Sequence, residues 1–227
     1  MGISQVDELN KKRETKKKET ENYLKIIQKH TSQNSYDFIN KITLDTQGLI
    51  DKFSRDSIRI SVIAEVSSGK STFLNALIFN NQVLESKIGE TTAKVFHIVY
   101  GDSFSVNGKK VKDIEALKNE ISSQNQENLT DINAKKDLNI KKIESKISLP
   151  NENLKKGVEL YDTPGFGTVN ETTMYKLLQN AVSKSDAIIL LLDITQGLKK
   201  NELNFVKDTL DNIPDNKRFI VLNKYDG

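Results

Sequence analysis

Ala64-Glu65-Val66-Ser67-Ser68-Gly69-Lys70-Ser71 is the stretch that decides the fold of this chain. An apolar run at 58–63 precedes it, and residues 72–79 follow it with apolar side chains at helical spacing. A strand, a Gly-Lys-Ser loop and a helix in this order are the context of a phosphate-binding loop, whose backbone N–H groups surround the phosphates. We expect Lys70 to reach the β- and γ-phosphates and the Ser71 hydroxyl to ligate Mg²⁺. Ala64 stands where the pattern G-x-x-x-x-G-K-[ST] has glycine, and a coincidental turn is the alternative.

Three further motifs follow in the order that a guanine-nucleotide site needs. Asp162-Thr163-Pro164-Gly165 fits D-x-x-G, with the aspartate holding Mg²⁺ through water and the Gly165 N–H meeting the γ-phosphate. Asn223-Lys224-Tyr225-Asp226 fits N-K-x-D, whose aspartate accepts hydrogen bonds from guanine N1 and N2, which adenine cannot match. Between the first two motifs, Thr92 or alternatively Thr91 supplies the switch threonine that ligates Mg²⁺. Each motif alone has a simpler interpretation as a turn or a strand end, but all four in order indicate one nucleotide site.

These motifs resemble those of a GTPase of the dynamin superfamily, specifically its bacterial dynamin-like and mitofusin-like branch. Residues 66–72 are similar to the family's phosphate loop, and Leu74-Asn75-Ala76-Leu77 to the start of its first helix. Residues 83–92 resemble the mitofusin-type first switch, and 154–166 the strand and second switch. The resemblance covers residues 57–227. It implies an α/β fold, a P-loop GTPase domain with a doubly wound, mainly parallel sheet, preceded by helices of a helical bundle.

The resemblance also implies which residues carry the chemistry. The nucleotide contacts would come from Glu65, Val66, Ser67, Ser68, Gly69, Lys70, Ser71, Thr72, Gly165, Asn223, Lys224 and Asp226. The catalytic residues would be Lys70, Ser67 and Thr92, and Mg²⁺ would be held by Ser71, Thr92 and, through water, Asp162.

Three positions bear on the rate of hydrolysis. Ser67 matches the position that in dynamins helps to hold a charge-compensating monovalent cation, K⁺ or Na⁺, in the GTPase dimer. Val66 stands where dynamins carry a polar side chain that assists the attacking water, and Phe166, not glutamine, follows the second switch motif. The resemblance therefore implies slow hydrolysis in the monomer and faster hydrolysis on dimerisation across the nucleotide face.

Composition narrows the class of protein. The chain has 227 residues, a net charge of +3 and no cysteine, which excludes a disulfide framework and a cysteine-based zinc site. This mild charge gives no reason to expect a nucleic-acid partner. The polar N-terminus lacks a signal core, and the longest apolar run, 187–192, is too short to span a membrane and indicates a buried strand. We expect a cytoplasmic protein, with peripheral association with the inner membrane in keeping with the family.

Hydrophobic patterning indicates how the chain is organised. Residues 1–56 predict two helices that meet near 31–36, and 57–227 predict a GTPase domain that is incomplete at its C-terminus, with an insertion at about 102–150. We place strands near 58–63, 94–100, 157–161, 187–192 and 218–222, and helices near 70–79, 171–184 and 199–212. The inserted part predicts a hairpin around Asn107-Gly108, a helix from Asp113 to about Ile121 and a strand at 141–149. Residues 122–137 predict a polar excursion that is either mobile or helical and has no core of its own.

Several candidates remain open at this stage. His97 and His30 are interpreted as packed or rim histidines. Asp193, Gln196 and Gly197 belong either to an ordinary strand-to-helix loop or to one that reaches a partner's active site. The leading function is a dynamin-like GTPase in membrane remodelling, fusion or tethering, with GTP or GDP, a homo- or hetero-dimer partner and membrane lipid, the lipid bound through regions outside this sequence. The alternatives are a soluble switch GTPase of the ribosome- or RNA-associated kind, and a guanine-nucleotide binding module with little hydrolysis.

Overall fold

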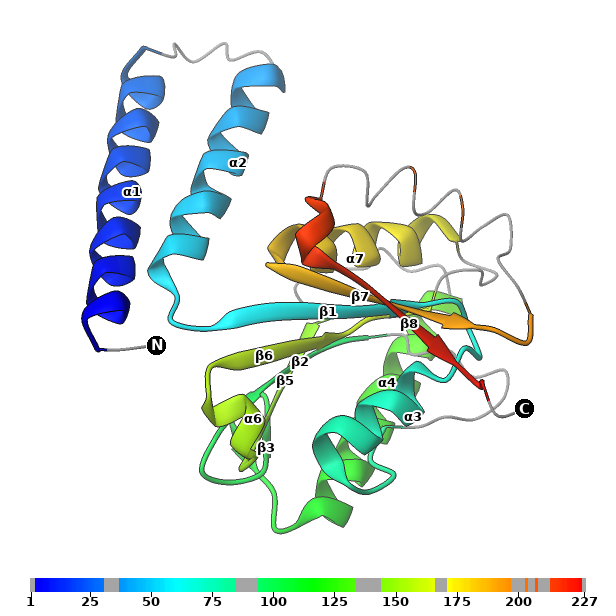
Figure 1. The fold of residues 1–227 in the computed structure, drawn as a ribbon. Helices are drawn as coiled ribbons and strands as arrows, with labels where there is room; N and C mark the ends of the chain where they lie inside the picture. The colour runs from blue at the N-terminus through cyan, green and yellow to red at the C-terminus, as the bar shows by residue number, and fades with distance from the viewer. Residues whose placement is uncertain are drawn as a thin grey trace. The chain divides into compact units, whose positions relative to one another are not determined.

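The computed structural model describes residues 3–30, 37–84, 94–133, 144–165, 171–196, 203, 207 and 213–225. The chain divides into two compact units, Met1–Asp56 and Ser57–Gly227, which are described separately (Figure 1).

The first unit is a helical hairpin of α1 (Ile3–His30) and α2 (Asp37–Ser54). Apolar side chains at helical spacing give each helix an inner stripe, and Leu24 and Ile50 are buried between them. Arg13 of α1 donates to the carbonyl oxygen of Arg55 at 3.1 Å and forms an ion pair with Asp56. The two predicted helices are therefore present. No helix in the described part of the chain combines the length and apolar character needed to cross a membrane.

The second unit is built on one eight-stranded sheet of order β4-β3-β5-β2-β6-β1-β7-β8. Four of its neighbouring pairs are parallel and three are antiparallel. The strands are β1 (Ile58–Ala64), β2 (Val95–Tyr100), β3 (Ser105–Val106), β4 (Lys109–Lys110), β5 (Glu144–Leu149), β6 (Val158–Asp162), β7 (Ala187–Asp193) and β8 (Arg218–Asn223).

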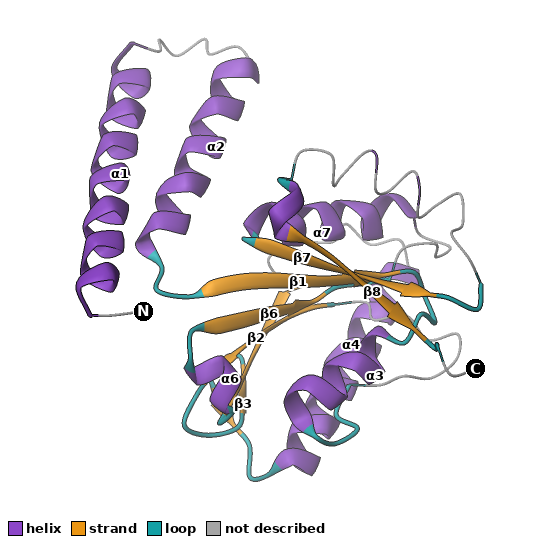
Figure 2. Cartoon of the chain, in the orientation of Figure 1, coloured by secondary structure: helices purple, strands orange, loops and turns teal. Residues whose placement is uncertain are grey.

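Helices cover both faces of this sheet, as a doubly wound α/β fold requires (Figure 2). One face carries α3 (Lys70–Leu74), the π-helical turn η1 (Asn75–Phe79) and α4 (Ile114–Asn133), and the opposite face carries α7 (Glu171–Lys184). Two short helices, α6 (Glu152–Lys155) and the 3₁₀ turn η3 (Asp215–Lys217), complete the described elements. The fold class expected from the sequence, a P-loop type α/β sheet that is mostly parallel, is confirmed.

Each face has its own apolar core. The larger core joins Leu74 and Ile78 to side chains of β1, β2, β5 and β6, including Val62, Ile98 and Leu160. The smaller one packs α7 against β1 and β7 through Ile63, Leu178, Val182, Ile188 and Leu190.

The individual elements follow the sequence prediction in most places. The five main strands and the helix at 171–184 lie where the patterning puts them, within one residue at each end. The helix predicted over 70–79 is divided, because its second half is a π-helical turn. The helix predicted through about Ile121 continues to Asn133, so the helical alternative for the polar excursion is the one observed over residues 122–133. The helix expected at 199–212 lies almost entirely outside the described residues.

The segment predicted as an insertion joins the main sheet. β5 pairs in parallel with β2, and the β3–β4 hairpin adds to the other edge of β5. Val106, Leu117 and Ile147 belong to the larger core. These residues therefore extend the sheet.

Candidate functional site

Residues 65–69 form the loop that connects β1 to α3. Ser67 and Gly69 adopt left-handed backbone angles, with φ of 67° and 90°. Inside the loop the Ser68 N–H donates to the Glu65 carbonyl oxygen at 3.2 Å, and the Phe73 N–H donates to that of Gly69 at 2.9 Å. The loop thus turns sharply and passes directly into the helix, which is the local geometry of a phosphate-binding loop.

Lys70 and Asp162 meet beneath this loop. The Lys70 ammonium and the Asp162 carboxylate form a hydrogen-bonded ion pair, and both side chains are buried. Asp162 ends β6 and Lys70 begins α3, so the parallel pairing of β1 with β6 places them together. The second carboxylate oxygen of Asp162, Oδ2, is buried without a hydrogen-bond partner among the described residues. A buried carboxylate oxygen without a partner is costly and indicates a place for a ligand.

The D-x-x-G segment is fixed against the phosphate loop. The Thr163 hydroxyl, fully buried, donates to the Val62 carbonyl oxygen at 2.8 Å. A Cβ placed on Gly165 would lie 2.8 Å from Cγ2 of Val66 and 3.1 Å from its backbone nitrogen. Only glycine permits this approach, so the two loops touch there. Thr163 stands at a variable position of the D-x-x-G motif, so the sequence pattern does not mark it.

Asn223 and Lys224 also reach the phosphate loop, from the end of β8. The Asn223 side-chain amide donates to the Ser68 carbonyl oxygen at 2.8 Å, and the Lys224 ammonium donates to that of Ser67 at 2.9 Å. Two motifs that are about 155 residues apart in sequence are therefore joined directly by hydrogen bonds.

Asp193 is a residue whose part in this site the sequence did not reveal. It ends β7, and its carboxylate accepts a hydrogen bond from the Lys224 ammonium at 2.7 Å. The Lys224 ammonium and the Thr195 hydroxyl hold the pKa of Asp193 well below its usual range. A terminal aspartate on the strand beside β8 was the only available signal.

Not every predicted site residue is described. Glu65, Ser71 and Thr72 lie in or directly after the phosphate loop. Thr91, Thr92, Phe166, Gly197 and Asp226 lie outside the described residues, so their predicted roles stay predictions.

The groups present fit a magnesium–nucleotide complex. Mg²⁺ prefers oxygen ligands, and the Asp162 carboxylate and the hydroxyl-bearing Ser71 both belong to this site. The unpartnered Asp162 oxygen would accept a metal-bound water, and Lys70 would balance phosphate charge. Within the described ranges, no cluster of three or more His, Cys, Asp or Glu side chains is arranged to hold a metal by itself.

His97 belongs to a separate polar cluster on the sheet. Its ring stacks on that of Tyr161, with centroids 4.4 Å apart, and its Nε2 lies 2.8 Å from a carboxylate oxygen of Glu159. Ser57 and Arg59 donate to the same carboxylate at 2.7 and 2.9 Å. His97 is thus a packed histidine, as the sequence pattern indicated.

Comparison with known proteins agrees with this geometry. The sequence model of the Dynamin family matches residues 60–225. Dynamin-like protein 1 of Campylobacter jejuni subsp. jejuni serotype O:23/36 (strain 81-176) is 26% identical over 249 residues, covering 88% of this chain and 34% of that protein. This chain therefore spans about a third of the length of that relative.

Solved structures resemble this chain to different degrees. One, of an oligomerised bacterial dynamin pair described as providing a mechanism for long-range sensing and tethering of membranes, is 21% identical. The match covers 91% of this chain and 32% of the solved chain, with a TM-score of 0.52. Era, in complex with MgGDPNP and a segment of 16S ribosomal RNA, is 15% identical over 74% of this chain and 40% of its own, with a TM-score of 0.39. By the family match over most of its length, supported by its similarity to bacterial dynamin-like proteins, this chain belongs to the dynamin family.

Proposed function

We propose that this chain binds GTP with Mg²⁺ and hydrolyses it, as the GTPase part of a bacterial dynamin-like protein. The observation that carries the proposal is the convergence of three motifs on one loop. Lys70 pairs with Asp162 beneath the loop, while Asn223 and Lys224 hold its backbone from the side. Family membership supports the same activity.

Lys70 and Asp162 would part when the nucleotide binds. Phosphoryl transfer depends mainly on positioning and on charge stabilisation. The Lys70 ammonium, now satisfied by Asp162, would turn to the phosphates. The freed carboxylate would then accept a hydrogen bond from water on the metal, and bound Mg²⁺ would supply charge neutralisation at the phosphate oxygens. The ion pair thus keeps both groups neutralised until the ligand replaces it.

Hydrolysis by the monomer is proposed to be slow. Val66 lies against Gly165, where the phosphate loop and the second switch motif touch. Its hydrocarbon side chain cannot orient a water molecule. Activation would come from a second GTPase domain across the nucleotide face, with a K⁺ or Na⁺ ion beside the exposed Ser67 compensating charge. Thr92 and Asp226 would supply the metal-bound hydroxyl and the guanine contact.

The larger function that we propose is membrane remodelling, fusion or tethering driven by GTP-dependent dimerisation. The likeness to a bacterial dynamin pair described as tethering membranes supports it. Lipid contact would be made by parts of the protein outside these 227 residues, and the protein would associate peripherally with the inner membrane from the cytoplasm.

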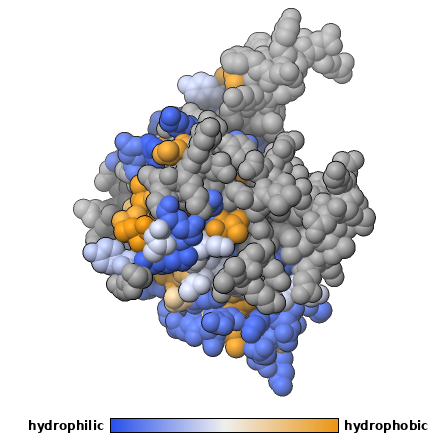
Figure 3. Space-filling model, turned by 90° about the vertical axis from the view of Figure 1, so that its right-hand side faces the viewer, coloured by the Kyte–Doolittle hydropathy of each residue, from blue (hydrophilic) through white to orange (hydrophobic). Residues whose placement is uncertain are grey.

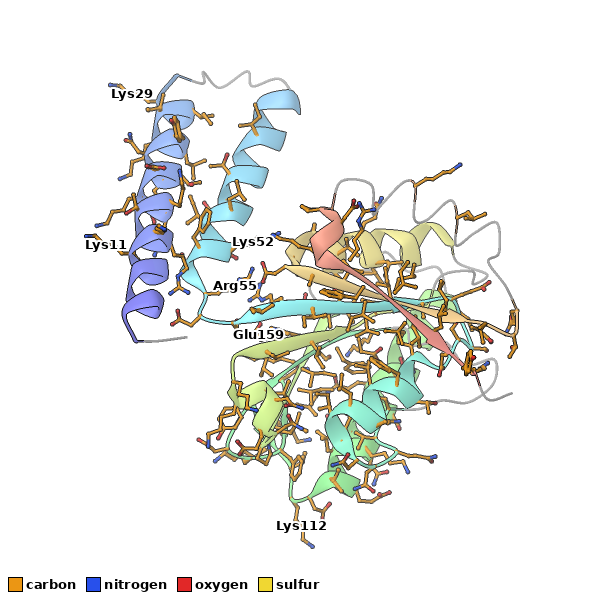
Figure 4. The ribbon with its side chains drawn as sticks, viewed as in Figure 1. Lys11, Lys29, Lys52, Arg55, Lys112 and Glu159 are labelled. Atoms are coloured by element: carbon orange, nitrogen blue, oxygen red, sulfur yellow. The ribbon has the colours of Figure 1, made fainter. Side chains whose placement is uncertain are left out.

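Nucleotide titration tests the proposed binding site. The protein should bind fluorescent GTP and GDP in the presence of Mg²⁺ and should discriminate against ATP by at least about 100-fold. Lys70→Ala should abolish binding of GTP, because the ammonium that would turn from Asp162 to the phosphates is removed. Lys112→Ala is the matched control, since this lysine is exposed and labelled far from the loop in Figure 4. Equal loss in both variants, or equal affinity for ATP, would contradict the proposal.

Turnover measurements test hydrolysis and dimerisation. Phosphate release per protein should rise with protein concentration and with K⁺ or Na⁺, and Lys70→Ala should remove it. Release that is independent of both would count against activation by dimerisation. No release at any concentration, with GTP binding intact, would support a binding module with little hydrolysis. Activation by RNA and not by concentration would favour the soluble switch GTPase.

A further inference from the structure

Asp193 makes two separate sets of contacts with its two carboxylate oxygens. Oδ1 accepts hydrogen bonds from the N–H and the hydroxyl of Thr195, at 3.0 and 2.7 Å, which form the local turn after β7. Oδ2 accepts from the Gln196 amide and the Lys224 ammonium, each at 2.7 Å. The side chain is 4% exposed. The local turn thus supplies three of these four donors, and Lys224 is the one that comes from outside the turn.

Lys224 links this carboxylate to the phosphate loop. Its ammonium also donates to the Ser67 carbonyl oxygen at 2.9 Å, so it lies between the two acceptors. Both Lys224 and Ser67 have left-handed backbone angles, with φ of 60° and 67°. L-residues adopt this conformation only when surrounding contacts hold them in it. Contacts that run from Asp193 through Lys224 to Ser67 join these two positions, beside the hydrogen bond from the Asn223 amide to the Ser68 carbonyl oxygen.

Strand pairing brings this chain of contacts together. β7 and β8 are parallel, and their register places Asp193 opposite Asn223, directly before Lys224. The Asn223 carbonyl oxygen also accepts from the Ile194 N–H at 3.1 Å, which fixes the ends of the two strands to each other. The Asp193 carboxylate is thus held at a set distance from the loop that follows β8.

We propose that Asp193 is a positioning residue of the guanine-nucleotide site, which acts by fixing Lys224 so that Lys224 holds the phosphate loop in its binding shape before nucleotide arrives. The inference rests on the proposed GTP site but assigns Asp193 a role within it. A loop that already has the bound shape loses less conformational freedom when nucleotide binds, and its affinity for the nucleotide is therefore higher. A nearly buried carboxylate also keeps the flexible lysine chain in one position.

Asp193→Asn separates the two sets of contacts. The asparagine oxygen still accepts from Thr195, while its amide group cannot accept from Lys224. Titration with fluorescent GDP should show a dissociation constant about tenfold higher, with an unchanged number of binding sites per protein. Asp215→Asn removes an exposed carboxylate that pairs with Arg218, and should leave the constant unchanged.

A double-mutant cycle tests the route through Lys224. Lys224→Met should weaken GDP binding by at least as much as Asp193→Asn, and Asp193→Asn should add less than twofold in the Lys224→Met background. Independent effects that multiply in the double variant would overturn the proposal. A dissociation constant within twofold of the wild type in Asp193→Asn would also overturn it. A reduced number of sites with unchanged affinity would show that the substitution acts only through folding, and would overturn it too.

Hydrogen exchange in the nucleotide-free intact protein tests the positioning without any ligand. Peptides that cover the phosphate loop should exchange faster in Asp193→Asn than in the wild type and in Asp215→Asn, while peptides from β1 and β6 should not change. Unchanged loop exchange would overturn the proposal. If the wild type failed to bind guanine nucleotide, the proposed function would fail, and this exchange difference would still decide whether Asp193 positions the loop.

Discussion

Gly69 is restricted in two independent ways. Its φ of 90° is a conformation that residues with a Cβ rarely adopt. A Cβ at this position would also lie 2.3 Å from Nδ2 of Asn223. That amide cannot move away freely, because it donates to the Ser68 carbonyl oxygen at 2.8 Å. A side chain at residue 69 would therefore disturb the contact with Asn223 of β8 as well as the turn of the phosphate loop itself.

Gly69→Ala should lower both stability and nucleotide affinity. The left-handed angle costs about 1–2 kcal/mol of folding free energy, and displacing Asn223 should lower affinity for GDP at least about tenfold. Gly108→Ala is the matched control, since Gly108 has a φ of 82° and no atom within 4 Å of an added Cβ. It should lose similar stability in thermal unfolding and keep its affinity for GDP. Equal affinities in the two variants would show that the Asn223 contact is unimportant.

Sequence predicted those site residues whose roles depend on a local motif. Lys70 and Asp162 were placed together because each ends or follows a strand in a known order of motifs. The contacts of Asp193 and Thr163 were not predicted, because they depend on which strands are neighbours and in what register. Asp193 meets Lys224 only because β7 pairs in parallel with β8. A single sequence does not give that register.

At the scale of elements, Asn75 holds the segment that follows α3. It begins the π-helical turn η1 and is buried, with 6% of its surface exposed. Its side-chain oxygen accepts from the N–H groups of Val83 and Leu84 at 3.1 and 2.8 Å, and its amide donates to the Leu84 carbonyl oxygen at 2.8 Å. One side chain thus satisfies three backbone groups of the segment after η1.

Asn75→Ala should destabilise the protein by about 2–4 kcal/mol, because it removes the side-chain partner of three backbone groups at residues 83 and 84, of which only the Val83 N–H keeps another acceptor, the Asn81 carbonyl oxygen at 3.1 Å. Chemical denaturation, followed by circular dichroism, measures this loss. Asn153→Ala is the control, since this asparagine is exposed in the first turn of α6, and should change stability by less than about 0.5 kcal/mol. A similar small effect at both positions would contradict the role assigned to Asn75.

Glu159 joins three elements through one carboxylate. It accepts hydrogen bonds from Ser57 and Arg59 at the start of β1, and it lies against His97 of β2. These partners, of which His97 has the largest effect, hold the pKa of Glu159 well below its ordinary value of 4.5. Because the folded-state pKa is depressed, the carboxylate stabilises the fold above about pH 4.5, and this contribution is lost as the pH falls below that value.

Glu159→Gln should therefore cost about 1–2 kcal/mol of unfolding free energy near pH 7. The difference from the wild type should shrink steadily between pH 4.5 and pH 2.5, as the wild-type carboxylate loses its advantage. Denaturation curves at several pH values measure it. Glu115→Gln is the control, because this carboxylate is 71% exposed, and its difference from the wild type should stay near zero throughout. A Glu159 effect that is constant with pH would contradict this account.

The elements differ in how well the sequence predicted them. β7 was predicted because a strand buried on both faces is a continuous apolar run. β1 is interrupted by Arg59 and Ser61, and it was predicted from its remaining apolar residues and the phosphate-loop motif that follows it. The end of α4 was left open between a mobile and a helical segment, because residues 122–133 are mostly polar and show no apolar periodicity. The π-helical turn was missed because it changes the hydrogen-bonding step of a helix without changing its composition.

At the scale of the whole sheet unit, the two edges of the sheet differ. β4 is two residues long and consists of the exposed Lys109 and Lys110, which protects that edge from pairing with another strand. β8 is six residues long, and within the described residues its only strand partner is β7. Ile220 and Leu222 on β8 are 65% and 56% exposed. On the face that Figure 3 shows, several apolar residues are exposed among hydrophilic ones.

A polypeptide of residues 1–227 by itself should consequently self-associate through β8, because a long apolar edge strand is a template for pairing. Ile220→Lys with Leu222→Lys should reduce this association, as lysine on an edge strand opposes the approach of another edge. Ile58→Lys is the matched control: Ile58 is 56% exposed, but it lies on the central strand β1, whose backbone is paired on both sides. Light scattering over a concentration series should show smaller particles for the double variant and no change for Ile58→Lys.

Equal reduction in both variants would mean that surface hydrophobicity in general, and not the open edge, drives the association. If the wild-type polypeptide stayed monomeric at every concentration, the β8 edge would not cause self-association of residues 1–227.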